Sequence, residues 1–211
     1  MRSAVHWYRW RVAIEAEHIP ITLAELHETL ILIAVGCQTT PPSISRQLMI
    51  PLQRCTQILR VGTELGFLDS GHRFGNHESF TLTTKGSRDL SEHLEAVRVS
   101  LVPAPGHVIS KFNPLDKQFK DIALQMLNEG IDGDSTARID GLVTKAMFVL
   151  DELSGWGVRF GGYRSRLEHA SLKLLEGRHQ YLVDPHVDSA HAIWWEWHAD
   201  LKIVVGVDDS Q

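Results

Sequence analysis

Histidine and carboxylate side chains gather in the segment HVDSAHAIWWEWH, residues 186–198, and such side chains can hold a metal ion or transfer protons. His191 and His198 are seven residues apart, which is two helical turns or about 10 Å along a helix. Zinc holds its ligands at about 2 Å, so these two histidines cannot share one ion. Asp188 and His191 lie closer together, but no further ligands accompany them. We therefore expect neither a metal nor a cofactor.

Catalytic motifs are missing from the sequence. It contains no glycine-rich phosphate loop, no G-x-S-x-G elbow and no H-E-x-x-H pair. Glu196 and Asp200 share a helix face at i and i+4, a spacing that more often gives solvated or salt-bridged carboxylates than catalytic ones. An enzyme or metal protein built around His191, Glu196 and His198 is thus the least favoured interpretation, and we expect no catalytic residue.

The three tryptophans of this segment divide into two kinds. Trp194 and Trp197 continue an apolar helical stripe, so we expect them in the core, although aromatic residues here could also line an effector pocket. Trp195 lies off the stripe. We therefore predict an effector site or subunit interface formed by Trp195, His191 and His198.

Length and composition favour two globular domains. The chain has 211 residues, which suits two domains of about 100 residues each, and 43% hydrophobic residues can build both cores. The longest apolar run, LILIAVGC, stops after eight residues, well short of the roughly 20 that cross a bilayer. Cys37 and Cys55 form neither a disulfide framework nor a zinc-ligand set. We expect a cytoplasmic protein without a membrane span.

Charge is distributed unevenly along the chain. The formal net charge is −5, yet residues 1–102 carry ten basic and ten acidic side chains, so the excess of acid lies in the second half. No acidic residue occurs between Glu28 and Glu64, a stretch that contains three arginines. A phosphate group could approach the protein there.

The first half predicts three helices. TLAELHETLILIAVG starts with Thr22, has Glu25 three residues later and ends at Gly36, which is the pattern of a capped helix. PPSISRQLM predicts a short second helix, and Pro51 suits the first turn of a third. The third helix turns Leu52, Cys55, Ile58 and Leu59 inward and leaves a polar face outside.

A hairpin and a fourth helix are predicted next. FLDS and SFTLT are strand-like runs that bracket GHRFGNHE, whose glycines and asparagine suit a hairpin turn. TTKGSRDLSEHLEAVRVSL then returns to helical spacing. Three helices, a hairpin and a helix follow one another in a winged helix-turn-helix.

The second half predicts helices only. VPAPGH, residues 102–107, marks the domain boundary. The first helix after it would be capped by Asn113 with Pro114 in its first turn, and the last would be capped by Asp188 and end at Gly206. We expect a mainly α protein with an N-terminal extension over 1–21, a winged helix-turn-helix domain over 22–101 and a module of about four helices over 107–207.

Residues 22–100, and FTLTTKGSRDL above all, resemble the winged-helix domain of MarR-type bacterial transcriptional regulators, in which a leucine-threonine-x-x-glycine signature closes the wing. KFNPLDKQFKD and DSAHAIWWEWHADL resemble the C-terminal module of a bacterial group with the same two-part layout. The resemblance implies a transcriptional regulator that binds double-stranded DNA as a homodimer, with a helical second half that serves dimerisation, sensing of a small-molecule effector, or both. Ordinary MarR proteins are shorter and dimerise through helices that flank the winged helix.

The resemblance also implies roles for the polar side chains around the third helix. Glutamine suits adenine and arginine suits guanine in the major groove, and the residues placed to read bases are Gln53, Arg54 and Gln57. The residues placed to contact phosphates are Ser43, Ser45, Arg46, Thr56 and Arg60. Arg73, at the tip of the hairpin, would enter a minor groove or meet the backbone.

Two further hypotheses stay open beside DNA binding. Winged helices also bind proteins, so the chain could be a protein–protein adaptor without DNA contact. A reactive Cys37 would make it a peroxide sensor, as some MarR-type proteins are, although no cationic neighbour in the sequence would lower the pKa of its thiol. The first 21 residues match nothing in the resembled family and could extend a dimer interface.

Overall fold

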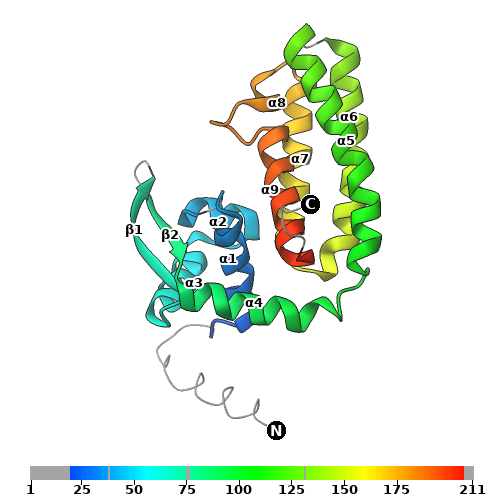
Figure 1. Cartoon of the computed structure of the whole chain (residues 1–211). Helices are drawn as coiled ribbons and strands as arrows, with labels where there is room; N and C mark the ends of the chain where they lie inside the picture. The colour runs from blue at the N-terminus through cyan, green and yellow to red at the C-terminus, as the bar shows by residue number, and fades with distance from the viewer. Residues whose placement is uncertain (1–19, 38, 75–76, 131, 207–211) are drawn as a thin grey trace.

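The computed structural model describes residues 20–37, 39–74, 77–130 and 132–206, so most of the predicted N-terminal extension lies outside the described residues. Within them the chain forms nine α-helices and one antiparallel hairpin, which confirms the mainly α prediction (Figure 1). The elements of the first half are α1 (Leu23–Val35), α2 (Pro41–Leu48), α3 (Leu52–Glu64), β1 (Leu68–Phe74), β2 (His77–Leu82) and α4 (Thr84–Arg98). Those of the second half are α5 (Pro105–Glu129), α6 (Gly133–Glu152), a short 3-10 turn (Leu153–Gly155), α7 (Arg159–Leu175), α8 (Gln180–Val183) and α9 (Ala190–Val205).

The ends of α1 lie where the sequence predicted them. The Thr22 hydroxyl accepts a hydrogen bond from the backbone N–H of Glu25 at 3.2 Å, and the Glu25 carboxylate accepts one from the Thr22 backbone N–H at 2.8 Å. This reciprocal box satisfies N–H groups that have no partner inside the helix. Gly36 ends α1 in the left-handed conformation, with φ 84°.

The hairpin and α4 meet at one close backbone approach. Thr83 begins α4: its hydroxyl accepts from the Gly86 backbone N–H at 3.0 Å and donates to the carbonyl oxygen of Gly66 at 2.7 Å. A Cβ atom at Gly86 would lie 2.1 Å from the carbonyl oxygen of Phe67, so no larger residue fits there. The threonine and glycine of TTKG thus bind the start of α4 to the base of the hairpin.

Helix α5 begins earlier than predicted. It starts at Pro105 and includes both Asn113 and Pro114, so the predicted start at Asn113 is wrong. Val108 and Phe112 are buried and extend the apolar stripe backward by two turns. Their burial stabilises the added turns by about 1.5–3 kcal/mol per side chain, which offsets the backbone hydrogen bond that Pro114 removes.

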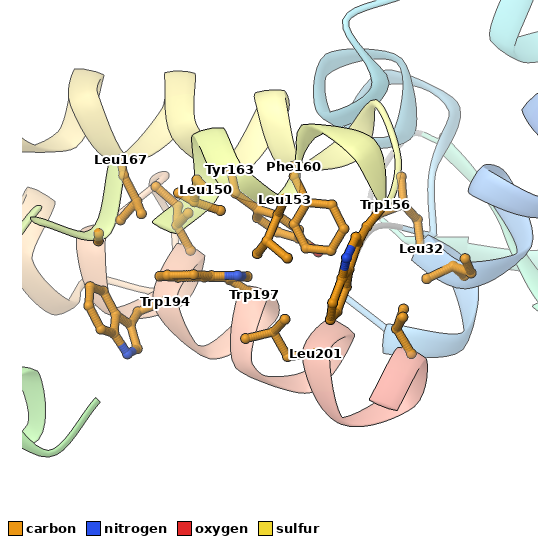
Figure 2. Close-up of a cluster of buried hydrophobic side chains, with 14 of the residues drawn as sticks. Leu32, Leu150, Leu153, Trp156, Phe160, Tyr163, Leu167, Trp194, Trp197 and Leu201 are labelled. Carbon is orange, nitrogen blue, oxygen red and sulfur yellow. The ribbon is translucent and has the colours of Figure 1, made fainter. Parts of the chain in front are cut away.

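The core of the second half forms where α7 packs on α9, with α5 and α6 alongside (Figure 2). Trp194 is 2% exposed and Trp197 is 0% exposed, which confirms that both belong to the core. The Trp194 ring stacks on Phe119 of α5, with centroids 4.4 Å apart and an angle of 7° between the rings. Tyr163 of α7 is also fully buried.

The two halves share this core. Helices α1 and α2 pack against α9 and α7, and Leu32 of α1 joins the aromatic cluster in Figure 2. The connection between α4, which ends at Arg98, and α5, which begins at Pro105, is 99–104. It overlaps the predicted linker at 102–104, whereas 105–107 belong to α5. The division into two domains stays a prediction. Among the described residues, no helix is both long and apolar enough to cross a bilayer.

Candidate nucleic-acid interface and the cleft beside it

The outer face of α3 carries polar side chains predicted to contact DNA. Gln53, Thr56 and Arg60 are exposed there, whereas Gln57 is half-buried. The inner face of α3 packs against α1, α2 and β1. The prediction that Leu52 faces inward is wrong, because Leu52 lies in the first turn of α3 and is 50% exposed. Thr56 donates its hydroxyl hydrogen to a carbonyl oxygen one turn earlier, at 2.9 Å, and keeps its acceptor lone pairs. Arg60 Nε lies 3.7 Å from the Glu64 carboxylate; both side chains are over 60% exposed, so water screens this pair and Arg60 can turn to a phosphate.

Arg54 has a structural role that the sequence did not predict. Its Nε and Nη2 atoms donate to the two carboxylate oxygens of Glu25, each at 2.8 Å, and Nη2 also donates to the carbonyl oxygen of Pro20 at 3.0 Å. The hydrogen bond from Arg54 lowers the pKa of Glu25 to about 2. Because Glu25 caps α1, this bidentate pair ties α3 to the start of α1. Base recognition by Arg54 stays a prediction and requires the pair to open.

The predicted phosphate contacts of α2 also stabilise the local fold. The Ser43 hydroxyl donates to the carbonyl oxygen of Thr40 at 2.8 Å, at the start of α2. The Ser45 hydroxyl donates to the carbonyl oxygen of Ile50 at 2.7 Å, which closes the turn between α2 and α3. Arg73 belongs to β1 beside the hairpin turn, and its side chain lies outside the described part of the structure.

A buried charged layer joins α1 to α7 and α9. The Arg159 guanidinium, 0% exposed, donates to Asp200 from Nε at 2.7 Å and from Nη2 at 3.0 Å, and to Glu28 from Nη1 at 2.8 Å. The Tyr163 hydroxyl donates to Asp200 at 3.1 Å. Burial lowers the pKa of Arg159, but the Asp200 and Glu28 carboxylates outweigh it and hold that pKa above its ordinary value. Arg159 therefore stays charged inside the protein.

A second arginine continues the layer toward α2. Arg166 Nη1 donates to Glu196 at 2.6 Å and to the side-chain oxygen of Gln47 at 2.5 Å, while Nη2 donates to Asp188 at 2.9 Å. The Gln47 amide nitrogen in turn donates to the backbone carbonyl of Arg159 at 2.7 Å. Gln47 is fully buried, so both ends of its amide are engaged in fixing α2 to α7.

Sequence reasoning missed this layer, although one signal for it exists. Arg159, Tyr163 and Arg166 follow one another at helical spacings of four and three, so they share a face of α7. Glu196 and Asp200 repeat the spacing of four on α9. Two matched patterns of opposite charge indicate helices that pair along one line, but only the tertiary structure shows that both patterns are buried.

An open cleft with a volume of about 940 Å³ lies between the α1–α2 connection and the segment that leads into α9. Ser43 and Arg46 line it from α2, and His191 and Trp195 line it from α9. Arg46 Nε lies 3.2 Å from the Asp188 carboxylate across the opening. Two of the three residues predicted for an effector site or interface therefore face the same cleft.

The third residue of that prediction, His198, points toward α5, where its Nδ1 atom lies 3.6 Å from the Asp116 carboxylate. The predicted cap of α9 is wrong by one position. Ser189 is the N-cap, and its hydroxyl accepts a backbone N–H of the first turn at 3.3 Å. Asp188 is unavailable as a cap because Arg166 and Arg46 bind its carboxylate.

Comparison of the chain with protein-family models, with curated proteins and with solved structures found no match. The resemblance in the sequence motifs therefore stays a prediction. Within the described ranges, no group of three histidine, cysteine, aspartate or glutamate side chains is placed to hold a metal ion.

Proposed function

We propose that the protein is a DNA-binding transcriptional regulator that inserts α3 into the major groove, with the hairpin beside it on the backbone or in a minor groove. One observation carries the proposal: the polar outer face of α3 is exposed, and residues 29–63, which include α2 and α3, contain no carboxylate. Phosphates repel carboxylates and bind arginines, so the side chains of this stretch bring no negative charge of their own to a duplex.

The proposed contacts divide into two kinds. Gln53 and Gln57 read base edges, because a glutamine amide pairs with adenine through a donor and an acceptor. Arg60, Thr56 and the hairpin contact phosphates and set the register of the protein on the duplex. The excess of acidic side chains lies in residues 103–211, so this half of the protein repels the duplex and favours approach through α3.

The regulator is proposed to act as a homodimer, since a single short recognition helix makes few base contacts. Two α3 helices related by a two-fold axis would read half-sites about one or two helical turns apart. Doubling the contacts gives the specificity that one modestly charged helix lacks.

The test begins with selection of bound duplexes from a random pool by the full-length protein, followed by anisotropy with the selected site and a scrambled one. Gln53→Ala should lower the preference for the selected site by about tenfold, since a good bidentate pair contributes about 1–3 kcal/mol. Arg60→Ala should weaken binding to both duplexes and reduce the salt slope by about one. Arg178→Ala is the matched control, because Arg178 is also exposed and paired with a surface glutamate, Glu176.

Failure to enrich any sequence, together with unchanged binding by the two α3 variants, would contradict the proposal. One observation favours a protein–protein adaptor in that case. Met49 is 58% exposed and Leu52 is 50% exposed, both beside the start of α3, where a protein partner could bury them. Leu52→Asp should then abolish capture of that partner and leave the fold intact.

A further inference from the structure

The cleft between α2 and α9 combines features that belong to a ligand site. The sequence also predicted phosphate contacts for two of its lining residues, Ser43 and Arg46, but the DNA contacts proposed above do not use them. Its volume of about 940 Å³ falls within the range of roughly 300–1,000 Å³ that holds small molecules. Both halves of the chain contribute walls, and the residues on those walls are chemically distinct. They include aromatic rings and an arginine.

Aromatic rings form one part of the lining. Trp195 is 53% exposed, although the tryptophans on either side of it in α9 are almost fully buried. Tyr181 and His169 also line the cleft, with their rings in edge contact at a centroid distance of 5.8 Å and an angle of 73°. A planar molecule that enters here removes the Trp195 face from water and gains stacking of about 0.5–1.5 kcal/mol beyond burial.

The cationic part of the lining is Arg46, whose side chain is 54% exposed. Its partner Asp188 is also held by Arg166 at 2.9 Å, so Asp188 keeps a cation when Arg46 turns away. Glu196, the other carboxylate on the wall, is likewise paired with Arg166 at 2.6 Å. Arg166 is shared by both carboxylates, and Arg46 and Arg166 together balance the charges of Asp188 and Glu196. Of these two arginines, Arg46 is the one that lines the cleft.

We propose that this cleft binds a small molecule that combines a planar ring system with an anionic group, the rings against Trp195 and the anion on Arg46. Ser43 and Thr40, at the start of α2, also line the cleft. Their hydroxyl groups donate within the cap of α2, Ser43 to the Thr40 carbonyl oxygen at 2.8 Å and Thr40 to the Ser43 hydroxyl oxygen at 2.9 Å, so Arg46 is the group that binds the anion. The proposal does not depend on DNA binding, because every contact it uses lies outside the outer face of α3.

A pair of dyes tests both the aromatic and the cationic contact of the site. 8-Anilinonaphthalene-1-sulfonate has a planar ring system and a sulfonate, and N-phenyl-1-naphthylamine is the same molecule without the anion. Titrations of the full-length protein, followed by dye fluorescence, should give binding of the sulfonate dye at least about tenfold tighter than that of the neutral dye, since a charged hydrogen bond contributes about 1.5–3 kcal/mol.

Variants then test which residue contacts the rings of the dye and which contacts its sulfonate. Arg46→Gln should lower the affinity for the sulfonate dye about tenfold and leave the affinity for the neutral dye unchanged. Trp195→Ala should lower the affinity for both dyes. Arg60→Ala and Phe148→Ala are matched controls, because they remove an exposed arginine and a 68% exposed aromatic ring that do not line the cleft. Urea unfolding of each variant confirms that the fold is retained.

Equal affinities for the two dyes would overturn the anionic part of the proposal. Affinities unaffected by both Arg46→Gln and Trp195→Ala would place the dye elsewhere and overturn the site as a whole. If the Arg60→Ala control also bound the sulfonate dye more weakly, the effect of Arg46 would be one of general surface charge. That result would likewise overturn the site.

Discussion

A single methyl group at Gly162 should separate α2 from α7. A Cβ atom there would lie 1.9 Å from the carbonyl oxygen of Gln47 and 2.8 Å from its carbonyl carbon, and both are backbone atoms that cannot rotate away. The two helices would have to move apart by at least about 1 Å, because real Cβ contacts essentially never fall below 3.0 Å. That movement stretches the hydrogen bonds by which Gln47 joins Arg159 and Arg166.

The magnitude follows from three contributions. Overpacking of a close contact costs about 1–3 kcal/mol. Weakening two buried hydrogen bonds costs about 0.5–1.5 kcal/mol each. Alanine is the better helix former by about 1 kcal/mol, which opposes these losses. Gly162→Ala should therefore lower the free energy of unfolding by about 1–5 kcal/mol, with about 3 kcal/mol as the central value.

Equilibrium unfolding in urea measures the effect. With a denaturant slope of about 3 kcal/mol/M, the midpoint of Gly162→Ala should fall by about 1 M. Gly141→Ala in α6 is the matched control: no heavy atom lies within 4 Å of its added Cβ, so the helix preference alone should raise stability by up to about 1 kcal/mol. A Gly162→Ala protein as stable as the wild type would refute the close approach of α2 and α7.

Three other predictions concern buried or titrating groups. Arg159→Met leaves the carboxylates of Glu28 and Asp200 without their buried cation, so the free energy of unfolding should drop by about 3–5 kcal/mol; a loss below 1 kcal/mol in urea unfolding would contradict this. Burial and a neighbouring histidine lower the pKa of His93 from 6.5 to about 4. As the pH falls, His93 is therefore protonated in the unfolded chain at a higher pH than in the folded protein. The free energy of unfolding should therefore fall by about 1–2 kcal/mol between pH 6.5 and 4, after allowance for solvent around the half-buried ring. His93→Asn should remove that part of the pH dependence of the urea midpoint. Burial, with a smaller effect of a nearby carboxylate, raises the pKa of Cys37 to about 12, so at pH 8 a disulfide reagent should modify this thiol at least about tenfold more slowly than free cysteine; an equal rate would restore the peroxide-sensor hypothesis.

Local signals in the sequence were sufficient for much of the secondary structure. Thr22 with Glu25 located the start of α1, and Gly36 located its end, because helix caps involve residues within four positions of each other. The start of α5 was predicted nine residues late, with the cap at Asn113 and not at Ala104. Asn113 and Pro114 have the chemistry of a helix start, but burial of the preceding apolar turn against α9 outweighed that preference.

The candidate site depended more strongly on packing between distant segments. The sequence indicated a polar face on α3 and an off-stripe Trp195, and both are exposed. It did not indicate that Arg54 pairs with Glu25, since those residues lie 29 positions apart. It also did not indicate the cleft, whose two walls come from opposite ends of the chain.

The sequence by itself determined a mainly α chain, the order of three helices, a hairpin and a helix, and the absence of acid from 29–63. Only the tertiary structure decided which charges are buried together. Glu28 and Arg159 are 131 residues apart, and their pairing depends on how α1 is rotated against α7. Periodicity shows which side chains share a face of one helix, whereas the partner of that face is fixed by the shape and burial of the whole core.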